Sequence, residues 1–297
     1  MQTKTKNFED TTTLSGGGEP PFYIRLLRNR SGTVGLVLIL FFTLISVAGA
    51  LKMTPYPIVE QHPLDRLQGP NVSYLLGTDQ FGRDLASRVM KGGTNSLKVA
   101  FLSVIISTTV GTAIGAISGY VGGFTDTAMM RLMDILFAFP ALLLALLVVT
   151  VLGPNLNNTI LAIGIVYTPI FARMARGPVL ALKETEFVTA ARCIGASELR
   201  ILVRHILPNM LAPLIVQVTL ALSWALITEA GLSFLGLGTQ PPEPSWGLML
   251  SDNRGLAEIA PWLILFPGLA LMLGVLGFNL FGDGLRDVLD PRLRGTR

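Results

Sequence analysis

Residues 183–209 read KETEFVTAARCIGASELRILVRHILPN, a charged and helix-forming segment that separates two apolar stretches of the chain. Thr185 and Ser197 belong to the residue types that begin helices, and Gly195 belongs to the type that ends them. The pattern predicts two short helices joined at Gly195, the second of which stops before Pro208. We call this helix–turn–helix unit the finger. A polar projection of this kind in an apolar chain predicts a docking site for another protein.

The composition of the 297-residue chain is that of an integral membrane protein. Hydrophobic residues make up 51% and charged residues 14% of the chain, whereas soluble domains carry about 25% charged residues. The one cysteine, Cys193, excludes an internal disulfide, and we expect it to pack within the finger. Two histidines far apart in the chain cannot form a clustered His/Cys metal site, so we predict no bound metal.

Apolar stretches predict six transmembrane helices. A helix needs about 20 mostly apolar residues to cross the hydrocarbon core of a bilayer. Five stretches meet this length, whereas a sixth is shorter and contains Pro169. We include it because an even number of spans places the finger and the basic C-terminal tail on the same side. The predicted spans are 33–51, 97–118, 129–152, 159–174, 211–235 and 261–281.

The distribution of basic residues orients these spans. Lys and Arg are in excess in the cytoplasmic loops of membrane proteins. Most of the 23 basic residues are cytoplasmic if the N-terminus lies inside. The net positive charge therefore reflects topology, and we predict no nucleic-acid partner. The predicted fold is an all-α membrane protein with six transmembrane helices and with both termini and the finger in the cytoplasm.

Other segments lie outside the predicted spans. Residues 1–31 form a cytoplasmic segment that contains an interfacial amphipathic helix, residues 52–96 a periplasmic segment, and residues 284–297 a cytoplasmic tail. Within the periplasmic segment, we expect a helix over 83–90 to rest on the membrane surface. We interpret Trp246 as an anchor at the outer membrane interface.

Glycines recur at four-residue spacing in and just after the second span. They are Gly111, Gly115, Gly119 and Gly123. Small residues at this spacing let two helices approach closely, so we predict tight packing along this face.

Ionisable residues within spans indicate functional sites by default. Glu229 lies near the outer end of the fifth span, and with Trp224 and Ser223 it forms the predicted substrate path. There, a carboxylate attracts the ammonium group of a cationic or zwitterionic substrate. Pairing with a partner subunit or contact with interfacial water are the alternatives for Glu229. We interpret Asp134 and Asn279, near the inner ends of two spans, as structural hydrogen-bonding groups.

The chain lacks the motifs of nucleotide hydrolysis and of nucleophilic catalysis. The dipeptide Gly-Lys never occurs, so no phosphate-binding loop of the GxxxxGK[ST] type is present. His62 and His205 lie outside the spans, without the partners of a catalytic triad. We therefore predict a protein that is not an enzyme and has no cofactor of its own.

The finger resembles the cytoplasmic EAA loop of bacterial ABC-importer permeases. That loop has a glutamate, two alanines, three residues, a glycine, nine residues and Ile-x-Leu-Pro. Residues at matching positions are Ala190, Ala191, Gly195, Leu207 and Pro208. Thr189 replaces the glutamate and His205 the isoleucine, so docking here cannot depend on that glutamate.

Further motifs resemble the C-type permease subunit of the dipeptide, oligopeptide and nickel importers. The similar blocks are 76–84, 119–123, 232–238, 241–247 and 282–287. Five blocks in the same order make the resemblance specific, and it covers about residues 25–295.

This resemblance implies a type I ABC importer in the bacterial inner membrane, with its transmembrane core over 94–283. The implied partners are a homologous permease, two cytoplasmic ATPases that bind ATP and magnesium, a periplasmic or lipid-anchored substrate-binding protein, and membrane lipid. The finger would be the coupling helix that seats in a groove on one ATPase. Its predicted docking residues are Glu186, Thr189, Ala190, Ala191, Arg192, Gly195, Ala196, Ser197, Glu198, Arg200 and Pro208.

The family leaves the substrate open. Import of dipeptides or oligopeptides is the leading hypothesis, and nickel or another small solute, such as a glutathione-like peptide, is the alternative on the same scaffold. A channel that works without ATPases is an alternative of a different class. An intramembrane protease would need a catalytic pair at membrane depth, which the sequence does not offer.

Overall fold

The computed structural model describes residues 21–289, and each regular element in that range is helical. Residues 1–20 and 290–297 lie outside the described residues, as do most of the predicted N-terminal segment and the end of the predicted tail. The helices are α1 (Phe22–Arg28), α2 (Arg30–Ala50), α3 (Leu85–Val121), α4 (Gly123–Phe137), α5 (Ala141–Leu152), α6 (Leu156–Leu182), α7 (Glu186–Cys193), α8 (Glu198–Ile201), α9 (Leu211–Phe234), α10 (Trp246–Asn253) and α11 (Trp262–Leu289). Two short helical turns, Pro63–Asp65 and Arg254–Leu256, belong to the loops near α10.

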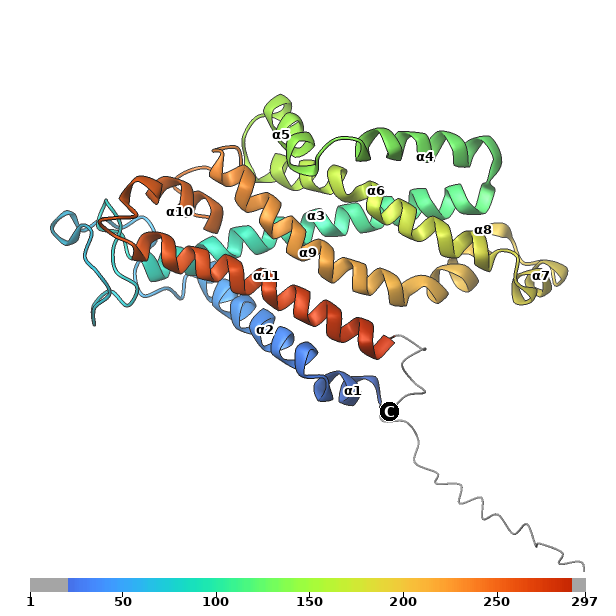
Figure 1. The fold of residues 1–297 in the computed structure, drawn as a ribbon, viewed down its shortest axis with the longest axis horizontal. Coiled ribbons are helices and arrows are strands. Elements are labelled where there is room, and N and C mark those ends of the chain that lie inside the picture. The colour runs from blue at the N-terminus through green and yellow to red at the C-terminus, as the bar shows by residue number, and fades with distance from the viewer. Residues whose placement is uncertain (1–20, 290–297) are drawn as a thin grey trace, which may run out of the picture.

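The long helices run side by side, with loops gathered at the two ends of the bundle. The segment 52–84 and α10 lie at one end, whereas α1 and the finger helices α7 and α8 lie at the other (Figure 1). Leu26 of α1 is buried against Leu285 and Val288 near the end of α11. The segment predicted to be external and the segments predicted to be cytoplasmic therefore lie at opposite ends of the bundle.

Within residues 21–289, five helices are long and apolar enough to cross a membrane, and there are six spans if α4 and α5 count as one. The predicted span over 129–152 is not one continuous helix, because α4 and α5 meet at an angle of 92°. The chain leaves the helical path at Ala138 and Phe139 and resumes it after Pro140. Proline has no N–H to donate and disfavours helical backbone in the residue before it, which explains the bend.

Several helices extend beyond the predicted spans. Helix α3 begins after Asp84, whose carboxylate accepts the backbone N–H of Ser87 at 2.8 Å, and then continues unbroken to Val121. The expectation of a separate surface helix over 83–90 is therefore wrong, since residues 85–90 are the first turns of the long helix α3. Helix α6 passes through Pro169 without a break.

Helices α3 and α6 pack with their backbones in contact, as the glycine spacing predicts. A Cβ atom on Gly115 would overlap the carbonyl oxygen of Ala172, and one on Gly111 would approach the carbonyl oxygen of Thr168. Gly123, by contrast, has open space around it and begins α4. The close contact makes α3 and α6 one stiff unit, which joins the finger to the middle of the bundle.

Trp246 lies in the core of the external end rather than at the membrane interface, so the interpretation as an aromatic anchor is wrong. Its side chain is 1% exposed. The indole N–H donates to the carbonyl oxygen of Val89 at 3.0 Å, and the ring stacks edge-on against Phe42 at 5.7 Å. A buried indole with its N–H satisfied stabilises the contact between α10, α3 and α2.

Candidate functional site: the cytoplasmic finger

The first half of the finger ends as the sequence predicts. Helix α7 stops at Cys193, and Gly195 follows with φ of +82°, a backbone region that favours glycine. The N–H of Gly195 donates to the Arg192 carbonyl at 2.9 Å, and that of Ala196 donates to the Ala191 carbonyl at 3.0 Å. These two bonds form a Schellman motif, which satisfies the last carbonyls of α7. Gly195 therefore sets the sharp reversal between α7 and α8.

The second half of the finger does not stop before Pro208, contrary to the prediction. Helical backbone runs from Glu198 to Phe234, widening to a five-residue turn over Leu202–Ile206. The side-chain amide of Asn209 donates to the carbonyl of His205 at 2.6 Å. The wide turn and this bond accommodate a proline that cannot donate a hydrogen bond. The finger is thus rigidly continuous with span α9.

One face of the finger belongs to the main hydrophobic core. Val188, Ala191, Ile201 and Ile206 are at most 5% exposed and lie in the same cluster as the buried residues of α3 and α6. Each fully buried aliphatic side chain contributes about 1.5–3 kcal/mol of hydrophobic stabilisation. The finger therefore moves with the transmembrane helices and not as a loose loop.

The opposite face of the finger presents large apolar side chains to water. Ile194 is 86% exposed and Phe187 is 43% exposed, whereas Leu199, which is 71% exposed, lines an apolar groove with residues of α3 and α9. The sequence interpretation missed these residues because it weighed the charged rim and the small residues of the tip. Cys193 is also exposed, so the prediction that it packs within the finger is wrong.

The predicted docking residues divide by burial. Those that face solvent are Glu186, Thr189, Ala190, Arg192, Gly195, Ser197, Glu198, Arg200 and Pro208. Ala191 is buried and Ala196 is half-buried. Thr185 and Ser197 do stand at the helix starts, but neither side chain makes a capping hydrogen bond.

Arg192 and Glu198 also hold the finger to the cytoplasmic end of α3. The hydroxyl of Tyr120 donates to the Glu198 carboxylate and accepts from Arg192 at 3.4 Å, and Arg192 lies 3.8 Å from Glu198. The contact with the tyrosine hydroxyl raises the pKa of Arg192. Lys183 adds a second tie, since its ammonium donates to the carbonyl of Gly119 at 3.0 Å. We call Tyr120, Arg192 and Glu198 the Tyr120 clamp.

Two family models match the chain. The model described as "binding-protein-dependent transport system inner membrane component" covers residues 111–295, a range that includes the whole finger.

The chain belongs to this family of transport permeases.

A second model, the N-terminal transmembrane domain of oligopeptide transport permease C, matches residues 22–70 of the permease. Together the two models support the interpretation as a C-type permease subunit.

Curated relatives span almost the whole permease. The dipeptide transport system permease protein DppC of Alkalihalophilus pseudofirmus is 47% identical over 91% of this chain and 88% of its own length. The glutathione transport system permease protein GsiD of Escherichia coli is 43% identical over 92% of this chain and 90% of its own length. The permease is accordingly a multi-pass protein of the bacterial inner membrane.

Among solved structures, the permease resembles the MetNI methionine ABC transporter captured in inward-facing conformations. The TM-score is 0.56 at 19% identity, with 67% of this chain and 95% of that chain covered. The likeness supports the transmembrane fold of a type I ABC importer.

The three residues predicted to line the substrate path occupy different environments in the permease. Trp224 is 44% exposed, whereas Ser223 is buried and its hydroxyl donates to the carbonyl of Val275 at 3.2 Å. Glu229 is fully buried, and its carboxylate accepts the hydroxyl of Ser233 at 2.7 Å. Of the three side chains, only that of Trp224 is exposed in the isolated chain. The three therefore do not line one common surface in this structure.

Proposed function

We propose that this permease imports dipeptides or short oligopeptides into the bacterial cytoplasm. The substrate class is supported by the relatives, since the names of those that match over some nine-tenths of both chains refer to dipeptides, peptides or glutathione. Nickel is less favoured for this chain, because the names of these relatives do not refer to a metal ion, whereas a glutathione-like peptide stays an alternative substrate.

The proposed complex contains a second permease, two cytoplasmic ATPases that bind ATP and magnesium, and an external substrate-binding protein that delivers the peptide. The family description, with its reference to binding-protein-dependent transport, favours this assembly. The external end of the bundle, formed by 52–84 and α10, is the surface on which the binding protein would dock (Figure 1).

The coupling role is supported by the difference between the buried and the exposed sides of the finger. Its inner face is part of the transmembrane core, and its tip presents Ile194 to the cytoplasm. Exposed apolar side chains on a rigid element favour a protein interface. ATP-driven closure of the ATPases would push on this tip, and the inner face would pass the movement to α6 and α9.

We also propose that the substrate passes Trp224 and Glu229 when α9 and α10 are separated. Gly247 of α10 lies against Ala230 so closely that a Cβ atom there would reach the Ala230 backbone at 2.5 Å. The Glu229 carboxylate can meet a peptide only if α9 and α10 separate when the complex opens to the outside.

Reconstitution tests the proposed function. The permease would be purified with its partner permease and ATPases, placed in liposomes and supplied with the binding protein and a labelled dipeptide. We expect uptake that requires both ATP and the binding protein. Uptake without nucleotide would indicate a channel, and transport of nickel but not of peptides would overturn the substrate class.

A further inference from the structure

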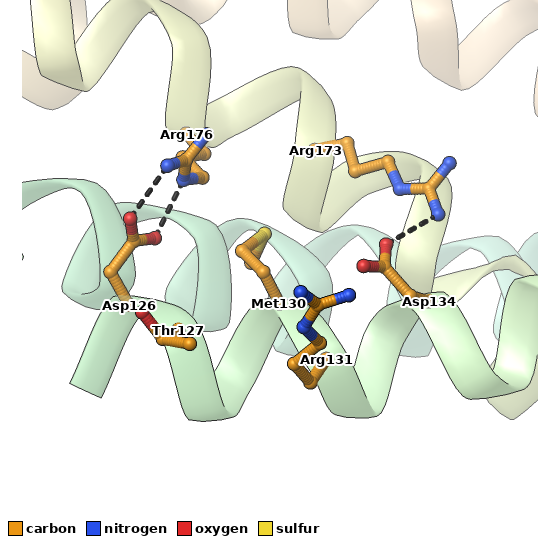
Figure 2. Close-up of a pocket in the computed structure, with 7 residues that line it drawn as sticks. All are labelled: Asp126, Thr127, Met130, Arg131, Asp134, Arg173 and Arg176. Atoms are coloured by element: carbon orange, nitrogen blue, oxygen red, sulfur yellow. Dashed lines mark hydrogen bonds and ion pairs between the residues drawn. The ribbon is translucent and has the colours of Figure 1, made fainter. Parts of the chain in front are cut away.

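A charged groove lies between α4 and α6, away from the finger surface. It has a volume of about 530 Å³ and is lined by Asp126, Thr127, Met130, Arg131, Asp134, Arg173 and Arg176. Figure 2 shows α4 and α6 side by side, with these side chains projecting into the space between them. Pockets for small molecules usually measure about 300–1,000 Å³, so the groove has room for a short peptide.

Two of the three arginines in the groove are already paired. Arg176 donates two hydrogen bonds to Asp126, both of 2.6 Å, and Arg173 donates to Asp134 at 2.8 Å (Figure 2). Arg173 also lies over the ring of Phe137 at 4.2 Å. These contacts hold four charged side chains in fixed positions.

Arg131 is different, because within residues 21–289 it makes no hydrogen bond or ion pair to another side chain, and its side chain is exposed. Three guanidinium groups face two carboxylates, so the groove keeps one positive charge that no described protein group balances. An arginine in this state is ready to bind a carboxylate through two parallel hydrogen bonds.

The charged groove lies well away from the cytoplasmic ends of α4 and α6. Arg131 lies nine residues into α4 and Arg173 lies nine residues before the end of α6. At 1.5 Å per residue, each is about 13 Å along the helix from its cytoplasmic end. Charged residues at such positions face a water-filled cavity or the interior of a bundle. Leu132, on the side of α4 that faces away from the groove, is an exposed apolar residue that suits lipid or a partner permease, and the exposed Ile135 lies one turn after Arg131 at the edge of the groove.

We propose that this groove is a transient binding site for peptides as they leave the translocation path, with Arg131 holding the C-terminal carboxylate. This inference rests on the proposed function. Met130 and Phe137 supply apolar surface for peptide side chains next to the charges. The Asp134 oxygen that does not face Arg173 can accept the N-terminal ammonium group. The groove would thereby bind the charged N- and C-terminal groups that all peptides share, without selecting among peptide side chains.

Direct binding to the assembled complex tests the proposal without the binding protein. The nucleotide-free complex would be placed in lipid nanodiscs, and saturation-transfer NMR would detect a dipeptide and the same dipeptide with an amidated C-terminus. We expect the free acid to bind at least about tenfold more tightly than the amide, because a charge-assisted hydrogen bond is lost in the amide. Arg131→Gln should remove this difference, and Arg131→Lys should keep part of it.

Arg28→Gln is the matched control, because Arg28 is an exposed cytoplasmic arginine on α1, away from the groove. Equal binding of acid and amide by the wild-type complex would overturn the proposal, as would an Arg131→Gln variant that binds like wild type. Retention of phosphatidylglycerol by wild type but not by Arg131→Gln, without any change in peptide binding, would instead assign the groove to a lipid phosphate. If the wild-type complex transports no peptide in liposomes, the proposed function itself fails.

Discussion

Truncation of Ile194 to alanine tests whether the apolar tip of the finger is buried against an ATPase. The side chain is 86% exposed in the isolated permease. The substitution removes three carbon atoms, each of which contributes about 0.8 kcal/mol when it is buried. If docking covers the exposed fraction, Ile194→Ala weakens the interface by about 2 kcal/mol, which corresponds to about 30-fold in the dissociation constant.

The measurement is the affinity of purified ATPase subunits for the permease pair in nanodiscs. Leu64→Ala is the control, because Leu64 is equally apolar and is 97% exposed, but lies in the external segment that the ATPases cannot reach. Because Ile194 is almost free of contacts within the chain, its truncation should leave the permease folded. An unchanged affinity for Ile194→Ala, or an equal loss for Leu64→Ala, would refute the reasoning.

Three further predictions concern coupling and the substrate path. Gly195→Val forces a branched side chain into a left-handed backbone at a cost of about 1–3 kcal/mol. We therefore expect this substitution to abolish substrate-stimulated ATP hydrolysis. The control Gly177→Val, at an open position inside α6, should leave the stimulation in place. Tyr120→Phe removes the hydroxyl that contacts Glu198, and we expect severalfold weaker stimulation by substrate with unchanged basal hydrolysis; equal stimulation would show that the clamp does not transmit movement. Glu229→Gln keeps the shape of the side chain without its charge, so a role in the substrate path predicts slower uptake of zwitterionic peptides in a complex that still folds, and equal uptake rates would make Glu229 a structural residue.

The sequence predicted the helices well where hydrophobicity alone decides them. Apolar runs over 33–51 and 211–235 lie close to α2 and α9 in the structure. It failed where a local group redirects the backbone, since the run over 129–152 is apolar throughout much of its length and only Pro140 signals the 92° bend. At Pro208 the sequence predicts the end of a helix, but the helix continues because the turn before the proline is wide.

The candidate site could be predicted in position but not in detail. Spacing alone placed the reversal at Gly195, because few residues other than glycine adopt its backbone conformation. Whether Ile194 points to water or to the core depends on how the finger packs against α3, which no local pattern records. The Tyr120 clamp joins residues more than 70 positions apart, so only the fold brings them together.

The charged groove was missed because its arginines were counted as cytoplasmic charge. One signal was available in the sequence: Asp126 and Asp134 lie eight residues apart, just before and within the predicted span 129–152, and Arg173 and Arg176 lie at and just after the end of the predicted span 159–174. Residues eight apart fall on nearly the same face of a helix, so two acidic positions facing two basic positions were there to be paired.

Chemical labelling of Cys193 tests the central claim that the finger docks on an ATPase most directly. It is the only cysteine of the chain, and it is exposed beside the tip of the finger. A maleimide reagent would be applied to the permease pair alone and to the full complex, with labelling of this permease resolved on a gel. We predict rapid labelling of the permease pair and strong protection in the full complex. Equal labelling rates in the two samples would contradict docking of the finger.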